Sequence, residues 1–203
     1  MGIQQFDPKN YRLDYVPQRL AALDVCVLAC HSVLSSRVSD PLELNFGSSK
    51  LSLPDSNLLI GIAIDAGLLA NRTLLNFLGI KLSNGSLVNE SYALTIEKFS
   101  LQLVPLADAC KVLEPMIPAA EMLNIWVEAL NTASKSAAHF TDAGATIRVA
   151  RLGFACYATS KLVRRYFFDA TRTPGPDSLV SLEVEPRFGG VWDSVDPTLN
   201  VLL

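Results

Sequence analysis

Two short stretches hold the side chains best suited to acid–base or phosphate chemistry. Residues 71–78, NRTLLNFL, contain Arg72, and residues 136–141, SAAHFT, contain His139. Because an imidazole titrates near neutral pH, His139 can serve as a general base or as a donor to a phosphate, with Arg72 as the cation that holds it. Arg72 and His139 are therefore the candidate catalytic residues. The alternative for His139 is a solvated position at a helix end, where it favours the negative end of the helix dipole.

A wider set of polar residues is predicted to bind a ligand around this pair. Asp65, Arg72 and Asn76 are spaced i, i+7 and i+11, so at about 100° per residue they share a stripe roughly 40° wide. The basic residues beyond position 145 have another interpretation besides ligand binding. Lys and Arg are enriched toward helix C-termini, and their aliphatic stems cover apolar surface. The predicted binding residues are Asp65, Arg72, Asn76, Lys135, His139, Arg148 and Arg151.

The sequence favours neither a metal centre nor a cofactor. Cys26, Cys30 and His31 lie close together, but no second cluster of Cys and His with ligand spacing follows them. No helix carries the Glu-x-x-His pairs of a di-iron bundle. Glycine-rich phosphate loops, Gly-x-Ser-x-Gly and His-Glu-x-x-His are also missing from the sequence. We therefore predict no metal and no cofactor, and expect the four cysteines to be buried thiols.

The two stretches resemble motifs of an uncharacterised bacterial family of all-helical proteins that is similar to HEPN-like bundles. One motif is Arg-x-Leu-x-x-Phe-Leu, here residues 72–78. The other is Asn-or-Lys-x-x-Ala-His-Leu-Thr, here residues 135–141 with Phe140 in place of Leu. The resemblance covers residues 57–141 and implies an antiparallel bundle in which Arg72 and His139 approach one another near helix ends. HEPN ribonucleases are marked by an Arg followed four to six residues later by His, whereas here Lys135 stands four residues before His139.

Arg72 has two interpretations. It lies within an otherwise apolar helix, and a buried guanidinium needs a carboxylate or several oxygen acceptors. Asp65 is two turns away, about 10 Å along the axis, so we expect the acceptors to be carbonyls near residues 138–141, beside His139. In one version this contact is a structural lock between two helices. In the other version, Arg72 and His139 open onto a cleft.

The helix that carries Arg72 is predicted to run from Pro54 to Ile80, with Gly79 as the residue that ends it. It is apolar on nearly every side, which is typical of a central helix packed on more than one face. A membrane span is the alternative for so apolar a run. Asp65 and Arg72 lie within it and would be costly in lipid, so we predict no membrane partner.

The predicted fold class is all-α, an antiparallel bundle of four long helices plus a short one. A β-hairpin is expected where leucines alternate on either side of Gly-Ser-Ser, and LVSLEV is the candidate for one more strand. Residues 1–16 form an arm whose aromatic side chains could lie over a groove. The expected long helices are 17–38, 54–80, 118–140 and 145–170, with the short helix at 105–115, the hairpin at 42–53 and the extra strand at 179–184.

We expect one domain, 1–203, with the helical bundle at 17–170 and a C-terminal wrapping tail at 171–203. Half the residues are hydrophobic, 18% are charged and the net charge is −3, so a surface that grips nucleic acid on all sides is not favoured. The first residues show no secretory signal, which predicts a cytoplasmic protein.

The predicted function is a non-enzymatic binding or assembly module, either a homodimer or bound to another protein. The last long helix is rich in aromatic residues on several sides, a surface that a second copy could bury. The alternative is a metal-independent ribonuclease or nucleotide-processing enzyme that uses His139 and Arg72.

Overall fold

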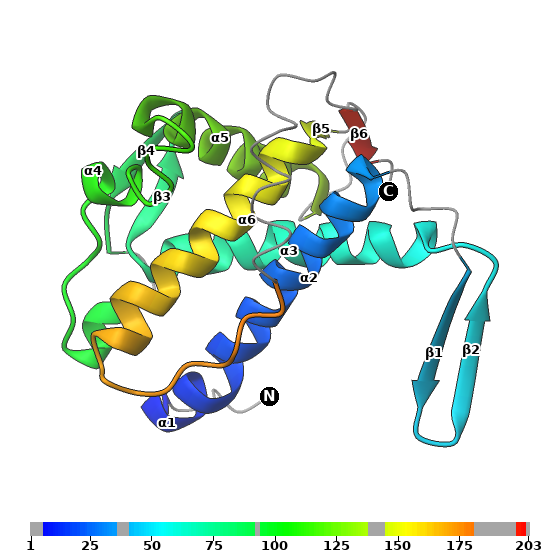
Figure 1. Ribbon diagram of the computed structural model, residues 1–203. Coiled ribbons are helices and arrows are strands. Elements are labelled where there is room, and N and C mark those ends of the chain that lie inside the picture. The colour runs from blue at the N-terminus through cyan, green and yellow to red at the C-terminus, as the bar shows by residue number, and fades with distance from the viewer. Residues whose placement is uncertain (1–5, 36–40, 92–93, 138–144, 181–197, 202–203) are drawn as a thin grey trace.

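Figure 1 shows a computed structural model of the chain, which describes residues 6–35, 41–91, 94–137, 145–180 and 198–201. The protein is mostly helical, with 60% of residues in helices and 12% in strands. This confirms the predicted helical character. The four longest helices are α2 (Val16–Leu34), α3 (Asn57–Phe77), α5 (Ala119–Thr132) and α6 (Val149–Val163).

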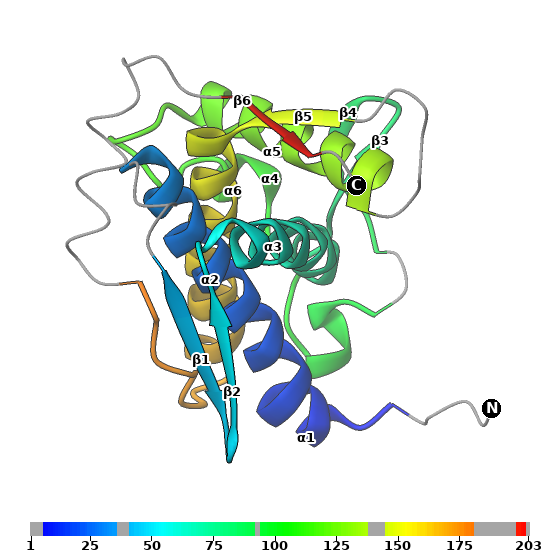
Figure 2. The same ribbon diagram turned by 90° about the vertical axis from the view of Figure 1, so that its right-hand side faces the viewer.

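The helices are not all aligned along one axis. Helices α2 and α6 lie side by side and run in opposite directions, whereas α3 crosses both of them (Figure 1). In Figure 2, α3 is seen almost end-on while α2 and α6 run down the picture. The antiparallel arrangement predicted for the four helices therefore describes α2 and α6, and it is wrong for α3.

Helix α6 is the most buried of the four, rather than the helix predicted at 54–80. Twelve of its 15 residues are buried, many of them Ala, Gly and Ser that let neighbouring helices come close. The buried residues of α3 begin only at Ile64, and before it Leu58 and Ile62 are 62% and 56% exposed. By length and composition, α3 is the one helix in the described part of the chain that could cross a membrane, a test that core helices also pass.

Aromatic rings close the core at the end of α6. A π-helical segment, Arg164–Asp169, continues this helix and buries Phe167 and Phe168. Phe167 meets Phe77 and Phe99 edge to face, with ring centroids 5.1 and 4.9 Å apart. This geometry is favourable for aromatic pairs. The aromatic residues predicted to form an assembly surface are thus largely inside the protein.

The first helical residues lie before position 17, where the first helix was predicted to begin. Helix α1 (Pro8–Asn10) is capped by Asp7, whose carboxylate accepts a hydrogen bond of 2.9 Å from the Lys9 amide. A π-helical segment, Tyr11–Tyr15, then leads directly into α2. Two of the aromatic side chains predicted to lie on an irregular arm are consequently held on a helical turn.

Three two-stranded antiparallel ladders join or flank the helices. The predicted hairpin is confirmed as β1 (Leu42–Phe46) and β2 (Ser49–Leu53). A second hairpin, β3 (Ile80–Ser83) and β4 (Ser86–Asn89), turns at Asn84-Gly85, where both residues have positive φ as a two-residue hairpin turn requires. Strand β5 (Ala145–Arg148) pairs with β6 (Thr198–Val201).

Other segments depart from the sequence prediction. Residues 145–148 are a strand, so the last long helix begins at Val149 and not at 145. The short helix expected at 105–115 is reduced to α4 (Leu106–Ala109), and a 3-10 turn occupies Ile96–Phe99. Leu179 and Val180 are not in a strand, and the rest of the predicted strand to 184 lies outside the described residues.

Candidate functional site

A cavity of about 480 Å³ lies between the start of α2 and the second half of α3. Its walls come from four parts of the chain: the π-helical segment before α2, the first turns of α2, α3 from Leu69 to Phe77, and Leu94 in the segment after the β3–β4 hairpin. The lining residues are Tyr11, Tyr15, Val16, Arg19, Leu69, Arg72, Thr73, Leu74, Asn76, Phe77 and Leu94. This volume falls within the range of small-ligand sites, roughly 300–1,000 Å³.

A second cavity of about 280 Å³ adjoins the first on the other side of Arg72 and Asn76. It lies between α3, the β3–β4 hairpin and the end of α5, and Arg72 and Asn76 belong to both linings. The remaining lining residues are Lys81, Leu82, Leu130 and Ser134. We call the two together the paired cavities.

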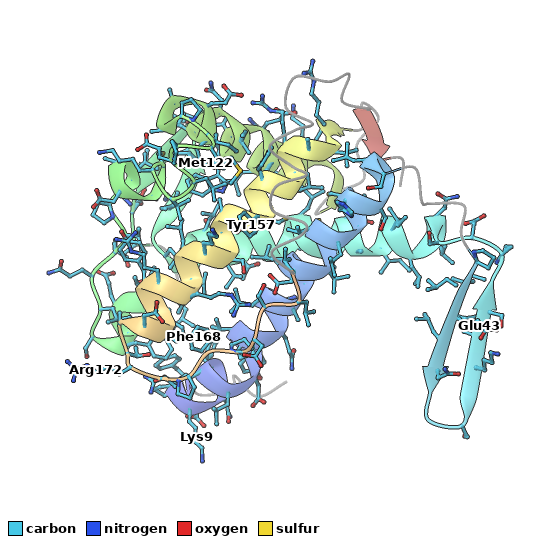
Figure 3. All side chains as sticks on the ribbon, viewed as in Figure 1. Lys9, Glu43, Met122, Tyr157, Phe168 and Arg172 are labelled. Atoms are coloured by element: carbon cyan, nitrogen blue, oxygen red, sulfur yellow. The ribbon has the colours of Figure 1, made fainter. Side chains whose placement is uncertain are left out.

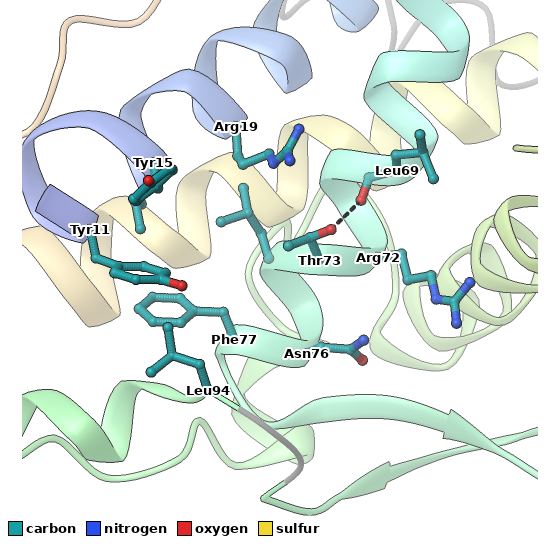
Figure 4. A pocket seen from close by; sticks show the side chains of 11 residues that line it. Tyr11, Tyr15, Arg19, Leu69, Arg72, Thr73, Asn76, Phe77 and Leu94 are labelled. Atoms are coloured by element: carbon teal, nitrogen blue, oxygen red, sulfur yellow. Dashed lines mark hydrogen bonds between the residues drawn. The ribbon is translucent and has the colours of Figure 1, made fainter. Parts of the chain in front are cut away.

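The two ends of the larger cavity differ in chemistry. Figure 4 shows Tyr11, Tyr15, Phe77 and Leu94 grouped at one end, while the side chains of Arg72 and Asn76 point away from them. The Tyr11 and Tyr15 rings lie 4.9 Å apart between centroids. One end is therefore aromatic and apolar, and the other end presents a guanidinium and an amide.

The polar groups at the Arg72 end are available to a ligand. Neither Arg19 nor Arg72 forms an ion pair with a described residue, and the Asn76 side chain makes no hydrogen bond to one. Lys81 is different, since its ammonium lies 2.6 Å from a carboxylate oxygen of Glu90. Among the described lining residues of the two cavities there is no Asp or Glu, so the net charge of this described lining is positive.

Only part of the predicted binding set is gathered at the paired cavities. Arg72 and Asn76 line both of them, whereas His139 lies outside the described residues. Lys135 is exposed on a π-helical segment, Ala133–Ala137, whose Ser134 lines the smaller cavity. The carbonyls of residues 138–141, predicted as acceptors for Arg72, are likewise outside the described part of the chain.

The other three predicted residues lie elsewhere. Arg148 is exposed at the residue that caps α6. Arg151 ties α6 to α5, because its guanidinium nitrogens lie 2.6 Å from Glu121 and 2.5 Å from Glu128. Asp65 lines neither cavity; one of its oxygens is buried without a hydrogen-bond partner, and burial raises the pKa of this carboxyl group.

Two buried polar clusters were not singled out in the sequence. Asp24, 1% exposed on α2, accepts hydrogen bonds from α6 and from residues 178–179. Asn71, fully buried on α3, accepts a 2.7 Å hydrogen bond from Thr159, whose hydroxyl in turn accepts one of 3.1 Å from the Trp126 indole. Each cluster joins segments far apart in the sequence, so spacing along one helix carries no sign of it.

Arg19, Tyr11 and Tyr15 are among the cavity residues that the predicted binding set lacked. The aromatic arm was expected over a groove, and its two tyrosines do line one. Nothing in the local sequence separates Arg19 from other surface arginines, because its role follows from the crossing of α2 over α3. Among the described residues, no group of three or more His, Cys, Asp or Glu is placed to hold a metal ion.

Comparison of the chain with protein-family models, with curated proteins and with solved structures finds no match. The paired cavities are therefore interpreted from their own chemistry.

Proposed function

We propose that this chain is a non-enzymatic, cytoplasmic binding and assembly module built on a bundle of its four long helices. The observation that carries the binding part is the pair of adjoining cavities that share Arg72 and Asn76. A concave site with an apolar body and a few convergent polar groups is the usual form of a small-ligand site.

The described lining supports binding rather than catalysis. General acid–base catalysis needs a group whose pKa lies near the working pH, most often His, Asp or Glu. None of these residue types lines either cavity in the described part of the chain. The arginine, asparagine, serine and threonine side chains of the lining can hold and orient a ligand. The lining also contains two tyrosines and Lys81, whose ammonium is paired with Glu90.

Filling the larger cavity should abolish ligand binding without unfolding the protein. Thr73 is exposed at the cavity wall and its hydroxyl donates only to the Leu69 carbonyl of its own helix. We expect compounds that raise the melting temperature of the wild type to have no effect on Thr73→Phe. The measurement is a thermal-shift screen with neutral, cationic and anionic small molecules. If no compound stabilises the wild type, or if every hit acts equally on Thr73→Phe, the binding proposal is wrong.

Assembly is supported by a second feature of α3, an exposed apolar stripe whose Leu69 also lines the larger cavity. Leu58, Ile62 and Leu69 are exposed on one stripe of α3 about 40° wide. The β1–β2 hairpin pairs Leu42 with Leu53 and Leu44 with Leu51, which places four leucines on one of its faces. Figure 3 shows this hairpin, marked by Glu43, standing clear of the helices.

We propose that a second copy of the chain covers these leucines. An isolated two-stranded hairpin is only marginally stable in water, so its leucine face favours a partner surface of the same kind. In a two-fold dimer, each hairpin can lie on the α3 stripe of the other copy, and one chain then supplies both halves of the interface.

A charge on the α3 stripe should therefore break the dimer. We expect the wild type to be dimeric at high micromolar concentration and Ile62→Glu to be monomeric, measured by light scattering coupled to gel filtration. Asn57→Glu adds the same charge to an exposed position of the same helix outside the stripe, and should remain dimeric. A wild type that is strictly monomeric, or an Asn57→Glu variant that dissociates equally, would count against this interface.

The alternative proposal is a ribonuclease or nucleotide-processing enzyme with Arg72 on phosphate and His139 as the base. It rests on the resemblance to HEPN-like bundles and on the position of Arg72 at an open cavity wall. RNA cleavage by the purified protein that is lost in His139→Ala would decide for this alternative.

A further inference from the structure

We infer that the paired cavities bind an amphipathic organic anion, with an aromatic or acyl body in the larger cavity and a carboxylate or phosphate held at Arg72. This inference rests on the proposed binding function and names the class of ligand. Four features of the described residues carry it: the charge of the lining, the unpaired polar groups, the aromatic end of the larger cavity and the small volume of the polar end.

The positive charge of the cavity lining indicates that the ligand carries an anionic group. Arg19 and Arg72 line the larger cavity, and the part of its lining that the structure describes contains no carboxylate. Both guanidiniums are without an ion pair to a described residue, in contrast to Arg151 and Arg164, which each contact a carboxylate. A guanidinium that is left unpaired in a concave site matches a carboxylate or a phosphate through two parallel hydrogen bonds. A neutral or cationic ligand would leave this charge uncompensated.

The Asn76 amide supplies a second hydrogen-bond donor beside Arg72. It makes no hydrogen bond to a described residue, and it stands one turn after Arg72 on the same helix, so the two side chains share a face. Figure 4 shows both of them pointing to the same side of α3. An anion at Arg72 can therefore accept from the amide nitrogen of Asn76 as well.

The end of the larger cavity that lies away from Arg72 indicates that the ligand also has an apolar body. Tyr11, Tyr15, Phe77 and Leu94 are grouped at this end (Figure 4), and the lining as a whole contains two tyrosine rings, Phe77 and four aliphatic side chains. Aromatic walls favour flat or extended apolar groups through large contact areas at low entropic cost. A free inorganic ion would leave this surface in contact with water, so the site is larger and more apolar than such an ion requires.

The polar end has room for one small headgroup rather than a polyanion chain. The smaller cavity has a volume of about 280 Å³, and Lys81, the other cation among its described lining residues, is already paired with Glu90. A nucleic-acid strand needs a continuous positive track, and the chain as a whole carries a net charge of −3. These features favour a single-headed small molecule.

The test is isothermal titration calorimetry of the full chain with four probes. 2-Naphthoate and 2-naphthyl phosphate carry both the body and the anionic group, 2-naphthalenemethanol carries only the body, and inorganic phosphate carries only the charge. We expect at least one of the two naphthyl anions to bind at least about tenfold more tightly than either of the last two probes, since a hydrogen bond to a charged group contributes that much or more. The preferred anion separates a carboxylate ligand from a phosphate ligand.

Matched arginine variants locate the headgroup. Arg72→Gln should weaken the binding of the preferred anion at least about tenfold. Arg148→Gln removes the same charge from an exposed position outside both cavities and should leave the affinity unchanged. Arg19→Gln, on the exposed wall of the larger cavity, is expected to weaken binding as well and is not needed for folding. Melting temperatures of all three variants identify any that is unfolded.

Each remaining outcome overturns the inference. If naphthalenemethanol binds as tightly as the anions, or if Arg72→Gln and Arg148→Gln behave alike, the ligand is not selected by its charge. If none of the four probes binds while a neutral or cationic compound from the screen does so in a manner blocked by Thr73→Phe, the ligand class is wrong but the binding function stands. If no compound of any class binds, both proposals fail.

Discussion

Asp24→Ala is expected to lower the free energy of unfolding by about 3 kcal/mol, the lower end of the roughly 3–5 kcal/mol lost when one member of a buried ion pair is removed. The Asp24 carboxylate is 1% exposed and holds three segments together. It accepts from Ser160 at 3.0 Å, from Arg164 and Ser178 at 3.2 Å, and from the Leu179 amide at 2.9 Å.

The lower value is expected because the Arg164 side chain stays 24% exposed and keeps other partners. Its guanidinium also donates to Ser160 and to the Pro176 carbonyl. Urea unfolding gives the free energy, and hydrogen exchange at Leu179 reports whether residues 174–180 are released. Asp169→Ala, at an exposed position near the end of α6's extension, should change stability by less than about 0.5 kcal/mol. Equal stability of the two variants would contradict the role given to Asp24.

Gly67→Ala is expected to cost about 2–3 kcal/mol, at the upper end of the range for overpacked cores. A Cβ at position 67 would overlap both Cβ and Sγ of Cys26, and would lie 3.5 Å from Sγ of Cys156. Glycine is therefore what allows α3 to cross α2 at this point. The helices themselves must move apart, since both cysteine side chains are in the core.

Gly61 provides the matched control on the same helix. A Cβ there would meet nothing within 4 Å, so Gly61→Ala should stabilise the protein by up to about 1 kcal/mol through helix propensity alone. The two identical substitutions, six positions apart, are thus expected to change stability in opposite directions. Urea unfolding of both variants is the measurement, and a Gly67→Ala protein as stable as Gly61→Ala would show that the crossing is looser than described.

The sequence was most informative where a local pattern decides the structure. Alternating leucines around Gly-Ser-Ser predicted the β1–β2 hairpin, and Gly79, with φ of +84°, ends α3 as expected. The register of β5 with β6 joins residues at least 50 positions apart. No local pattern specifies that pairing, and the sequence therefore predicted residues 145–148 as the start of a helix.

Apolar character alone did not identify the central helix. Leu58 and Ile62 made 54–80 resemble a core helix, yet they are exposed, whereas the small residues of α6 fill the core. Of the candidate site, the pattern along α3 found Arg72 and Asn76, because both lie on one helix face. Arg19 was not found, since its place in the site depends on where α2 crosses α3.

The bonds to Asp24 also set an order of events during synthesis. The Leu179 amide is 155 residues further along the chain than the carboxylate it donates to. At about 5–20 residues per second, a ribosome needs roughly 8–31 s after making α2 before that donor exists. Until then the nascent protein carries a charged group at the place where α2 and α6 will meet, so α2 can complete its packing only when the chain beyond α6 has emerged.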